Sequence, residues 1–336
     1  IYTSVNTLSL HDALPIGAAL LLREMLPRLP LHISTQANVL NTRTALHYHQ
    51  ATGATRIVLS REMSLTDIVA MRAALPPELA LETFVHGAMC VAYSGRCLLS
   101  AALTGRSANR GECAQPCRWQ YHVSEQTRPG QHLPVLEEDR GTYLFSAYDL
   151  CMLPHLPELM AAGVESLKIE GRMKTAYYVA TVVSAYRRAL DLIATQGEDA
   201  YRQAVPALMT ELAKASHRKN NTGFFFGAPS PAAGAGGFEQ SMEFVAQVSQ
   251  GANANEPALV TLKNRFFVGD ALEVLTPEGS KPFTVEGITL SETGEAVQTA
   301  SVAGTTLLMH FPFAVGEGDL LRGPNRNHRT NPTPKA

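Results

Sequence analysis

Four of the five cysteines in this chain fall within one segment, CVAYSGRCLLSAALTGRSANRGECAQPC, at residues 90–117. They are Cys90, Cys97, Cys113 and Cys117, spaced C-x6-C-x15-C-x3-C, and Cys151 follows later in the chain. Cysteine thiolates act as nucleophiles and as ligands of zinc and iron–sulfur clusters. A single buried thiol is an ordinary core residue, but four in one loop-rich segment favour a shared metal or cofactor.

The cysteine spacing narrows the kind of metal centre. Zinc ribbons usually carry paired C-x2-C knuckles, and this segment has none. Iron–sulfur clusters also use four thiolates and accept more varied spacing. The pattern therefore favours an iron–sulfur cluster, with zinc as the alternative. Disulfides are disfavoured because the cysteine count is odd and no secretion signal is visible, so we expect a cytoplasmic protein in a reducing compartment.

A second group of reactive residues comes with the segment ESLKIEG at residues 165–171. It consists of Glu170, Arg172 and Lys174. The dipole at a helix N-terminus prefers anions, so Arg and Lys are unexpected there as mere solvent-exposed residues. They would suit an anion site for a carboxylate substrate or an RNA phosphate. The residues alone leave both interpretations open.

His86 lies shortly before Cys90 and raises the question of a cysteine peptidase. The serine-hydrolase pattern G-x-S-x-G and the zincin pattern H-E-x-x-H are both absent from the sequence. Clustered cysteines also fit a cofactor better than a single nucleophile. We therefore interpret His86 as a strand-end histidine or a neighbour of the metal centre, in preference to a catalytic base.

The segment SHRKNNTGFFFG at residues 216–227 combines basic and aromatic side chains. Such a mixture suits phosphate contacts and base stacking in an RNA-binding surface. The alternative is a surface turn followed by a core strand. We favour that alternative for the aromatic residues 224–226.

Short apolar runs alternate with helical patterns from about residue 31 onward. Strands are expected at residues 31–35, 56–60, 80–87, 142–146 and 165–171. Between them, Asn38 is expected to cap one helix, Ser64 and Asp67 form a capping signature before the next, and a later helix should end near Gly163. A longer amphipathic helix is expected over residues 176–193. This alternation is typical of a parallel sheet.

Functional groups gather at the carboxyl ends of parallel strands, so this order should bring the reactive residues to one face. Cys90 follows the third expected strand, Cys151 the fourth and Glu170 the fifth, and the other cysteines lie in the long insertion after the third. Five units cannot close an eight-stranded barrel. We predict an α/β protein with an incomplete (β/α) TIM-like barrel, and an open doubly wound sheet is the alternative.

The pattern changes after a run of small residues, GAPSPAAGAGG, which marks a linker. Beyond it, short strands separated by turn residues predict a small antiparallel β-barrel. The first residues resemble translated adapter sequence, so we expect a genuine N-terminal portion to be missing. The expected organisation is a non-native extension at residues 1–16, a partial barrel at 17–226 with a cysteine-rich insertion at 88–140, a linker at 227–237, a β-barrel at 238–323 and a disordered tail at 324–336.

Composition agrees with a soluble globular protein of about two domains. The chain has 336 residues, of which 45% are hydrophobic and 17% charged, and its net charge is −2. Its apolar runs are shorter than the roughly 18 residues of a membrane span, so no membrane partner is expected. Because the net charge is near neutral, any surface that binds nucleic acid must be a local basic patch.

Three motifs in order resemble a known family. ETFVHGAMCVAYSGRCLLS, NRGECAQPCRW and SLKIEGRMK are similar to segments of the collagenase-like peptidases, family 32 of the unclassified (U) peptidases. The resemblance runs from about Ser34 to Gly227 and more weakly through the C-terminal domain. Within the family, YDLCMLPHLPELMAAGVESLKIEGRMKTAYYVATV and TGFFFG are most similar to the bacterial proteins that hydroxylate the wobble uridine of tRNA.

The resemblance implies a tRNA uridine hydroxylase that forms 5-hydroxyuridine in a prephenate-dependent reaction. Its partners would be tRNA, prephenate or another small carboxylate, and a homologous partner subunit. The resemblance also implies a 4Fe–4S cluster held by Cys90, Cys97, Cys113 and Cys117, with Cys151 as an alternate ligand. The candidate catalytic residues are Glu170, Arg172, Lys174 and His86.

Two other functions stay open from the sequence. One is a collagenase-like peptidase, as the family description suggests. The other is a non-enzymatic RNA-binding or assembly protein whose cluster is only structural, since small β-barrels often bind RNA or peptides. Iron content and the modification state of RNA would separate these functions.

Overall fold

The computed structural model describes residues 16–90, 92–119, 122–123, 133–134, 148–227 and 239–326. The chain divides into two compact units. The first consists of Ile1–Met173 and Arg218–Gly236, and the second of Lys174–His217 and Gly237–Ala336. The strand expected at residues 142–146, nearly all of the expected N-terminal extension and linker, and most of the expected tail lie outside the described residues.

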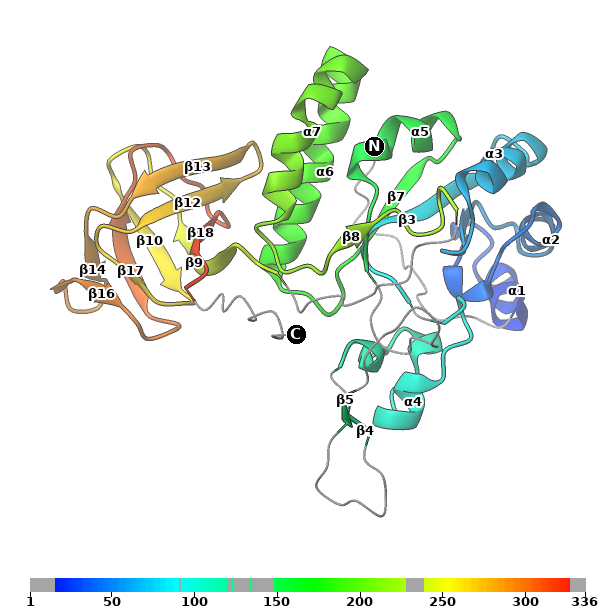
Figure 1. Ribbon diagram of the computed structural model, residues 1–336, viewed down its shortest axis with the longest axis horizontal. Coiled ribbons are helices and arrows are strands. Elements are labelled where there is room, and N and C mark those ends of the chain that lie inside the picture. Colours follow the sequence, from blue (N-terminus) through cyan, green and yellow to red (C-terminus); the bar gives the residue numbers. More distant parts are fainter. Residues whose placement is uncertain are drawn as a thin grey trace. The chain divides into compact units, whose positions relative to one another are not determined.

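The first unit carries the strand–helix alternation (Figure 1). Its helices are α1 (Ile16–Met25), α2 (Thr42–Thr52), α3 (Leu65–Ala74), α4 (Leu99–Thr104) and α5 (Leu156–Ala161). Its strands are β1 (His32–Ile33), β2 (Arg56–Val58), β3 (Ala80–Ala88), β6 (Asp149–Cys151), β7 (Ser166–Glu170) and β8 (Asn220–Asn221), together with the antiparallel pair β4 (His122–Val123) and β5 (Leu133–Pro134). Short 3-10 turns cover Thr35–Ala37, Ala108–Arg110, Pro116–Arg118 and Leu153–His155.

Strand β3 is the centre of a six-stranded sheet. β1 pairs with β2, β2 with β3, and β3 with β7, all in parallel. Every residue of β3 after Ala80 is buried, as expected for a parallel strand covered on both faces. The first unit therefore has the mixed α/β fold with a parallel sheet that the sequence predicts. The closure of this sheet into a partial (β/α) barrel stays a prediction.

One strand departs from the expected pattern. β6 runs antiparallel to β3 with Cys151 opposite His86, and β8 then pairs in parallel with β6. The sequence predicts Cys151 just after a parallel strand, but Cys151 is the buried last residue of β6 itself. The prediction that consecutive strand–helix connections bring all reactive residues to one face is therefore wrong for Cys151. Strand direction and register depend on partners far away in the sequence, which a local pattern does not contain.

Local helix signals act mostly where the sequence places them. Ser64 and Asp67 form a complete capping box at α3, in which Asp67 N donates to Ser64 Oγ at 3.1 Å and Ser64 N donates to Asp67 Oδ2 at 3.2 Å. The cap predicted at Asn38 is wrong. Helix α2 begins after Asn41, whose side chain accepts a backbone N–H of the first turn, and Asn38 takes a left-handed conformation at the end of the preceding 3-10 turn.

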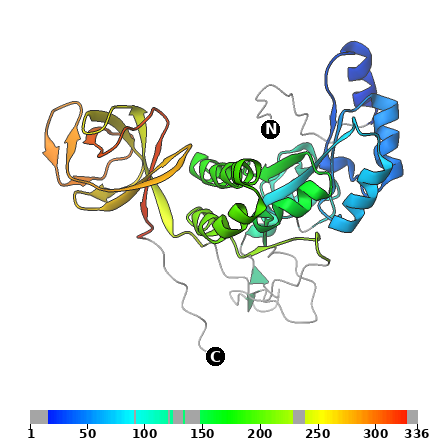
Figure 2. The same ribbon diagram turned by 90° about the horizontal axis from the view of Figure 1, so that it is seen from above.

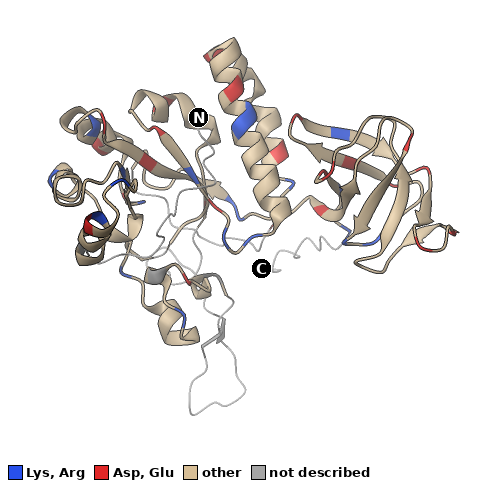
Figure 3. Cartoon of the chain, turned by 180° about the vertical axis from the view of Figure 1, so that it is seen from behind, with Lys and Arg blue, Asp and Glu red and all other residues tan. Residues whose placement is uncertain are grey.

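The second unit begins with two long helices, α6 (Ala176–Gln196) and α7 (Glu198–Leu212), which lie side by side in both ribbon views (Figure 2). α6 is the helix predicted over residues 176–193. Acidic and basic residues are interspersed along these helices (Figure 3), and Arg187 pairs with Asp191 one turn later. No helix in the described part of the chain is long and apolar enough to cross a membrane.

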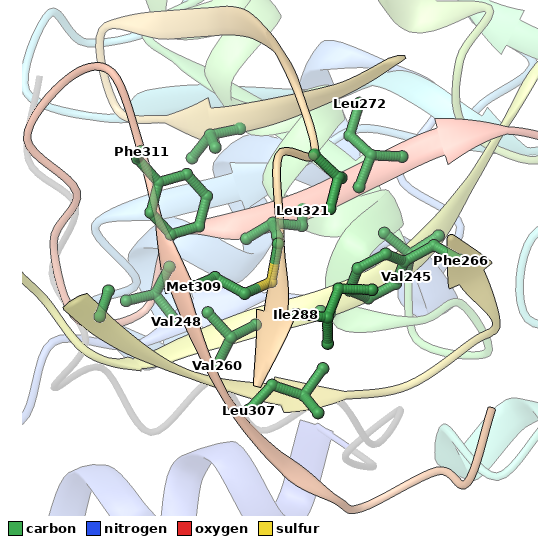
Figure 4. Packing of buried hydrophobic residues seen from close by; sticks show 14 of the residues in the cluster. Val245, Val248, Val260, Phe266, Leu272, Ile288, Leu307, Met309, Phe311 and Leu321 are labelled. Carbon is green, nitrogen blue, oxygen red and sulfur yellow. The ribbon is translucent and has the colours of Figure 1, made fainter. Parts of the chain in front are cut away.

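The rest of the second unit is an antiparallel β domain. Its strands are β9 (Met242–Gln250), β10 (Pro257–Leu262), β11 (Phe266–Phe267), β12 (Ala271–Thr276), β13 (Gly279–Thr284), β14 (Ile288–Leu290), β15 (Ala296–Val297), β16 (Thr299–Ala300), β17 (Thr306–His310) and β18 (Leu320–Pro324). Eight of them form one sheet in the order β13-β12-β18-β9-β10-β17-β14-β15. Val260, Leu307, Met309 and Phe311 point into a common apolar core (Figure 4). The predicted antiparallel β domain is confirmed.

A buried ion cluster joins α7 to the β domain within the second unit. Arg322 of β18 is fully buried and donates from Nε to Glu273 Oε2 at 2.9 Å. It also pairs with Glu211 of α7. Lys214 Nζ lies 2.8 Å from Glu273 Oε2, which completes a set of two cations and two carboxylates. Buried charges persist only when they are paired in this way.

Candidate functional site

A cavity of about 610 Å³ lies at the carboxyl ends of β3 and β7 in the first unit. The four clustered cysteines Cys90, Cys97, Cys113 and Cys117 all line it, as do Glu170 and Arg172. Cys90 lies two residues past the end of β3, and Glu170 ends β7. Because β3 and β7 are parallel neighbours, their carboxyl ends meet at one edge of the sheet. The cavity therefore gathers residues from four stretches of the sequence, at residues 34–36, 61, 84–117 and 168–173.

A close backbone approach places Glu170 at this edge. Gly87 of β3 has a φ of +101° and lies beside Glu170 in the register of β3 and β7. A Cβ atom on Gly87 would stand 2.2 Å from the Glu170 carbonyl oxygen. Only glycine tolerates both the positive φ and this contact. The glycine thus allows β7 to bring Glu170 close to the end of β3.

The cysteine-rich insertion is pinned to the first unit by buried and half-buried polar side chains. Gln36 Oε1 accepts from Gly95 N at 2.7 Å, and its Nε2 donates to the Ala108 carbonyl at 3.1 Å. Glu62 accepts from Ser94 N at 2.8 Å and from Ser94 Oγ at 3.2 Å. These bonds tie both ends of the stretch from Ser94 to Ala108 to the segments that follow β1 and β2.

Arg61 lies at the centre of the cavity's charged groups. Its Nη1 donates to Cys90 Sγ at 2.6 Å, and its Nη2 lies 3.7 Å from Glu170 Oε2. The guanidinium also stacks on the Phe84 ring, with Cζ 3.9 Å from the ring centroid. The Arg61 side chain is only 11% exposed. A nearly buried cation therefore holds a thiol and a carboxylate together.

The cysteine sulfurs form no disulfide bonds, and those in the cavity are partly accessible. Cys97, Cys113 and Cys117 are half-buried while Cys90 is exposed. Cys113 Sγ accepts from Gln115 N at 3.2 Å. Burial raises the pKa of Cys113 above its ordinary value, and the neighbouring Cys90 and Cys97 raise it further, despite the opposing effects of Gln115 N and Arg172. Cys90 and Cys97 affect the pKa of Cys113 because all three thiols line the same cavity.

The donor set suits a four-thiolate group in kind and number. Four free thiols line one cavity, and two of them accept hydrogen bonds to sulfur, a contact that also surrounds cluster ligands. Among the described residues no three Cys, His, Asp or Glu side chains are arranged so as to hold a metal ion. The fit to a cluster therefore rests on donor chemistry and on the shared cavity.

Of the predicted group Glu170, Arg172 and Lys174, only the first two lie in the cavity. Glu170 Oε1 accepts from Arg172 N at 3.0 Å, and both side chains line the cavity. Lys174 belongs to the second unit, where its Nζ donates to the Ser216 carbonyl at 2.8 Å and lies 4.8 Å from the centroid of the Tyr178 ring. The structure thus brings Glu170 and Arg172, but not Lys174, to the cysteine-lined cavity.

His86 and Cys151 lie within the sheet. His86 is buried in β3, Cys151 is buried in β6, and the two face each other across the antiparallel pairing. Neither is among the described residues that line the cavity, and no histidine is. A strand histidine is one of the interpretations that the sequence favours for His86.

The basic and aromatic segment has mixed surroundings. Arg218 is buried, and its backbone N donates to Asp149 Oδ2 at 3.0 Å. Phe225 is buried, whereas Phe226 is 54% exposed and packs on the His155 ring at a centroid distance of 4.7 Å. Arg218 precedes β8, and residues 223–226 form a turn after it, so the core strand favoured for residues 224–226 is wrong. None of these residues lines the cysteine cavity.

Sequence reasoning missed Gln36, Arg61, Glu62 and Lys168 as cavity residues or anchors. A usable signal was present, since Gln36 follows β1 and both Arg61 and Glu62 follow β2. The residues after β1 and β2 lie at the carboxyl ends of parallel strands, as Cys90 and Glu170 do. The rule that functional groups gather at carboxyl ends applies to every strand of a parallel sheet.

Comparison with known proteins gives relatives of several kinds. The chain is 34% identical over 347 residues to tRNA hydroxylation protein P of Escherichia coli, covering 88% of this chain and 73% of that protein. It is 39% identical over 197 residues to a 23S rRNA 5-hydroxycytidine synthase of the same organism, covering 57% of this chain and 28% of that protein. It is 27% identical over 286 residues to a collagenase of Porphyromonas gingivalis, covering 82% and 62%.

Sequence models of one protein family match both parts of the chain. The description "Peptidase family U32" applies to residues 7–234, and "Peptidase family U32 C-terminal domain" applies to residues 240–322. The first match includes every residue that lines the cavity. The expected family is confirmed, and this chain belongs to peptidase family U32.

Proposed function

We propose that this protein hydroxylates RNA, and that its product is 5-hydroxyuridine at the wobble position of tRNA in a prephenate-dependent reaction. Relatives named for tRNA hydroxylation and for rRNA 5-hydroxycytidine synthesis support the reaction class. The observation that carries the proposal is the single cavity in which four free thiols meet Arg61, Glu170 and Arg172. tRNA is then the macromolecular partner, and a homologous partner subunit stays a prediction.

The cavity residues would divide the work. Cys90, Cys97, Cys113 and Cys117 would hold a 4Fe–4S cluster, with Cys151 as the alternate ligand and zinc as the alternative metal. A bound cluster would supply one-electron redox chemistry. The protein's own part is to bind and orient the organic substrates beside it, which requires groups that recognise anions and groups that move protons.

The charged side chains suit a carboxylate substrate such as prephenate. Arg61, Lys168 and Arg172 outnumber the carboxylates Glu112 and Glu170 among the described lining residues. Guanidinium groups bind carboxylates through paired, charge-assisted hydrogen bonds. Glu170, fixed by Arg172 N and faced by Arg61, would accept a proton from the bound substrate or orient it.

Replacement of Arg172 by alanine tests the proposal. Arg172 is exposed in the cavity and contributes a backbone N–H to Glu170, which alanine retains. Loss of one charge-assisted contact should lower 5-hydroxyuridine in tRNA about 10- to 100-fold. The measurement is nucleoside mass spectrometry of tRNA from a strain that lacks the gene and carries the variant. Iron content of the anaerobically purified variant should match the wild type.

Arg43→Ala is the matched control, because Arg43 is an exposed residue of α2 that does not line the cavity. Wild-type levels of 5-hydroxyuridine in the Arg172→Ala strain would remove Arg172 from the site. A strain lacking the gene whose tRNA keeps its full 5-hydroxyuridine would sink the proposed reaction itself. Retained iron with no change in any RNA would favour a structural cluster in a non-enzymatic protein.

Peptidase activity is the second candidate, because a relative is named collagenase and the family carries the peptidase description. Cys90 is the exposed thiol that could serve as nucleophile. No described histidine lines the cavity to act as its base, which weighs against this function. Proteolysis by pure protein that is insensitive to chelators and abolished by Cys90→Ser would establish it in place of hydroxylation.

A further inference from the structure

The cysteine-rich insertion presents an aromatic ring and a cation at the two ends of one tight turn. Arg96 N donates to the Tyr93 carbonyl at 3.0 Å, which closes a four-residue turn over Tyr93, Ser94, Gly95 and Arg96. Gly95 stands at the third position with a φ of +75°, as the type II geometry requires. Residues at the two ends of such a turn have Cα atoms within about 7 Å of each other.

The backbone of this turn is held firmly while its two end side chains are exposed. Ser94 is 3% exposed, and its backbone N donates a hydrogen bond to Glu62. Gly95 N donates a hydrogen bond to Gln36 Oε1 at 2.7 Å. Tyr93, in contrast, is 65% exposed, although it also lines the cysteine cavity. An ordered backbone that displays a large aromatic side chain to solvent at a cavity rim is typical of a recognition element.

The charge of residues 92–119, the part of the insertion around the turn, points to the chemistry of its partner; the whole insertion at residues 88–140 is nearly balanced, with six arginines and five acidic residues. Residues 92–119 contain four arginines and one acidic residue, within a chain whose net charge is −2. They are Arg96, Arg106, Arg110 and Arg118 on one side and Glu112 on the other. Arg96 and Arg106 are exposed. A basic surface with exposed aromatic rings fits single-stranded nucleic acid, since cations bind phosphates and rings stack on bases.

We propose that the turn Tyr93–Arg96 is the element that receives the RNA strand at the cavity mouth, with the Tyr93 ring stacking on a base and Arg96 contacting a phosphate. The inference rests on the proposed function, which it deepens by naming how the nucleotide is held. The cavity of about 610 Å³ beside Tyr93 has the size of a small-molecule site. A base unstacked from a loop can enter such a site, as RNA-modifying enzymes require.

The test measures binding of a tRNA anticodon stem-loop, with uridine at the wobble position, to the full chain. Tyr93→Ala should weaken binding about 5- to 150-fold, and Tyr93→Phe should stay within about threefold of the wild type, because phenylalanine keeps the stacking face. Arg96→Gln should lower the slope of log affinity against log salt by about 1 and weaken binding to all RNA sequences alike. Arg43→Ala is the matched control from an exposed position outside the cavity, and it should bind as the wild type does.

The outcomes separate this inference from the proposed function. Wild-type affinity in Tyr93→Ala, or equal losses in Tyr93→Ala and Arg43→Ala, would overturn the inference even if the gene is needed for 5-hydroxyuridine. Loss of stem-loop binding in Tyr93→Ala, in a protein whose gene proves unnecessary for tRNA modification, would uphold the RNA-binding turn and reject the reaction. Binding of a collagen peptide, and not RNA, that depends on Tyr93 would overturn the inference in favour of a peptide site.

Discussion

At the scale of single residues, the cavity depends on how thiols and charges are combined. The Arg61 guanidinium reaches both Cys90 Sγ and Glu170, so the thiol group and the anion group share one cation. Arginine suits this position because its planar fork can donate in two directions at once and stack on Phe84. Cys90 and the candidate catalytic residue Glu170, which the sequence presents in separate motifs, are therefore linked electrostatically through Arg61.

The ligand set is tested by comparing two single-cysteine variants. Cys113→Ala should lose the cluster, because a four-thiolate site with one ligand missing binds its cluster poorly. Cys151→Ala should keep it, because Cys151 is buried in β6 and does not line the cavity. Iron and sulfide are measured in anaerobically purified protein, with the visible absorption spectrum. The reverse result, iron lost from Cys151→Ala and kept in Cys113→Ala, would show that the ligand set contains Cys151. Stoichiometric zinc without sulfide would reject an iron–sulfur cluster.

At the scale of elements, the insertion is positioned by side chains on the segments after β1 and β2. Gln36 and Glu62 bind its backbone, and Gly95 fits against Gln36 so closely that a Cβ would stand 2.1 Å from the Gln36 carbonyl oxygen. These contacts hold the backbone on which the following cysteines, beginning with Cys97, are positioned. Loops that carry function are commonly held on a rigid scaffold in this way.

Gly95→Ala and Gly105→Ala form a matched pair for this element. Both glycines have a positive φ, of +75° and +70°, but nothing lies within 4 Å of the Cβ that would be added at Gly105. Gly105→Ala should cost only the conformational penalty, about 1 kcal/mol. Gly95→Ala must also displace the Gln36 backbone, so hydrogen exchange and proteolysis of the insertion should increase and iron loading should fall. Equal behaviour of the two variants would mean that the insertion is not anchored at Gly95.

At the scale of the whole molecule, each unit contains a buried carboxylate held by cations. Glu82 of β3 contacts Lys168 at 3.3 Å and Arg56 at 3.1 Å in the first unit, and Glu211 pairs with Arg322 in the second. Burial alone would raise the pKa of Glu211, but Arg322 and Lys214 outweigh burial and hold its pKa below the ordinary value. Both units should therefore be sensitive to acid.

Arg322→Met should destabilise the second unit by about 3–5 kcal/mol, because it removes the fully buried cation shared by Glu211 and the half-buried Glu273 and leaves them only Lys214. Arg326→Met is the control, since Arg326 is 43% exposed and its pair with Asp270 should contribute less than about 1 kcal/mol. The free energy of unfolding is measured with denaturant at pH 7. A loss in Arg322→Met no larger than that in Arg326→Met would contradict a stabilising role for the cluster.

The same comparison has a pH dependence with a definite sign. A carboxyl whose folded-state pKa is depressed stabilises the fold above its unfolded pKa, and this stability is lost as the pH falls through the folded pKa. The wild type should therefore lose stability below the ordinary glutamate pKa of 4.5. Arg322→Met should show a smaller loss over that range, because without Arg322 the pKa of Glu211 is depressed less.

The sequence by itself determined the features that depend on near neighbours. The capping box at Ser64 and the helix over residues 176–193 follow from spacing within one element, and the parallel sheet follows from the order of successive strands and helices. The family followed from three ordered motifs. The placement of Cys90 and Glu170 at one edge could also be predicted, because a parallel sheet puts every carboxyl end on the same side.

Only the tertiary structure decided which of these residues meet. In the structure Cys151 lies opposite His86 in the antiparallel pairing of β6 with β3, and Lys174 belongs to the second unit. Arg61 donates a hydrogen bond to Cys90, and the Tyr93 ring is exposed on a turn whose backbone is held by hydrogen bonds. Each of these depends on strand direction, register or a contact between segments far apart in the chain. Such contacts are selected by the packing of the whole fold, and local patterns of residues do not specify them.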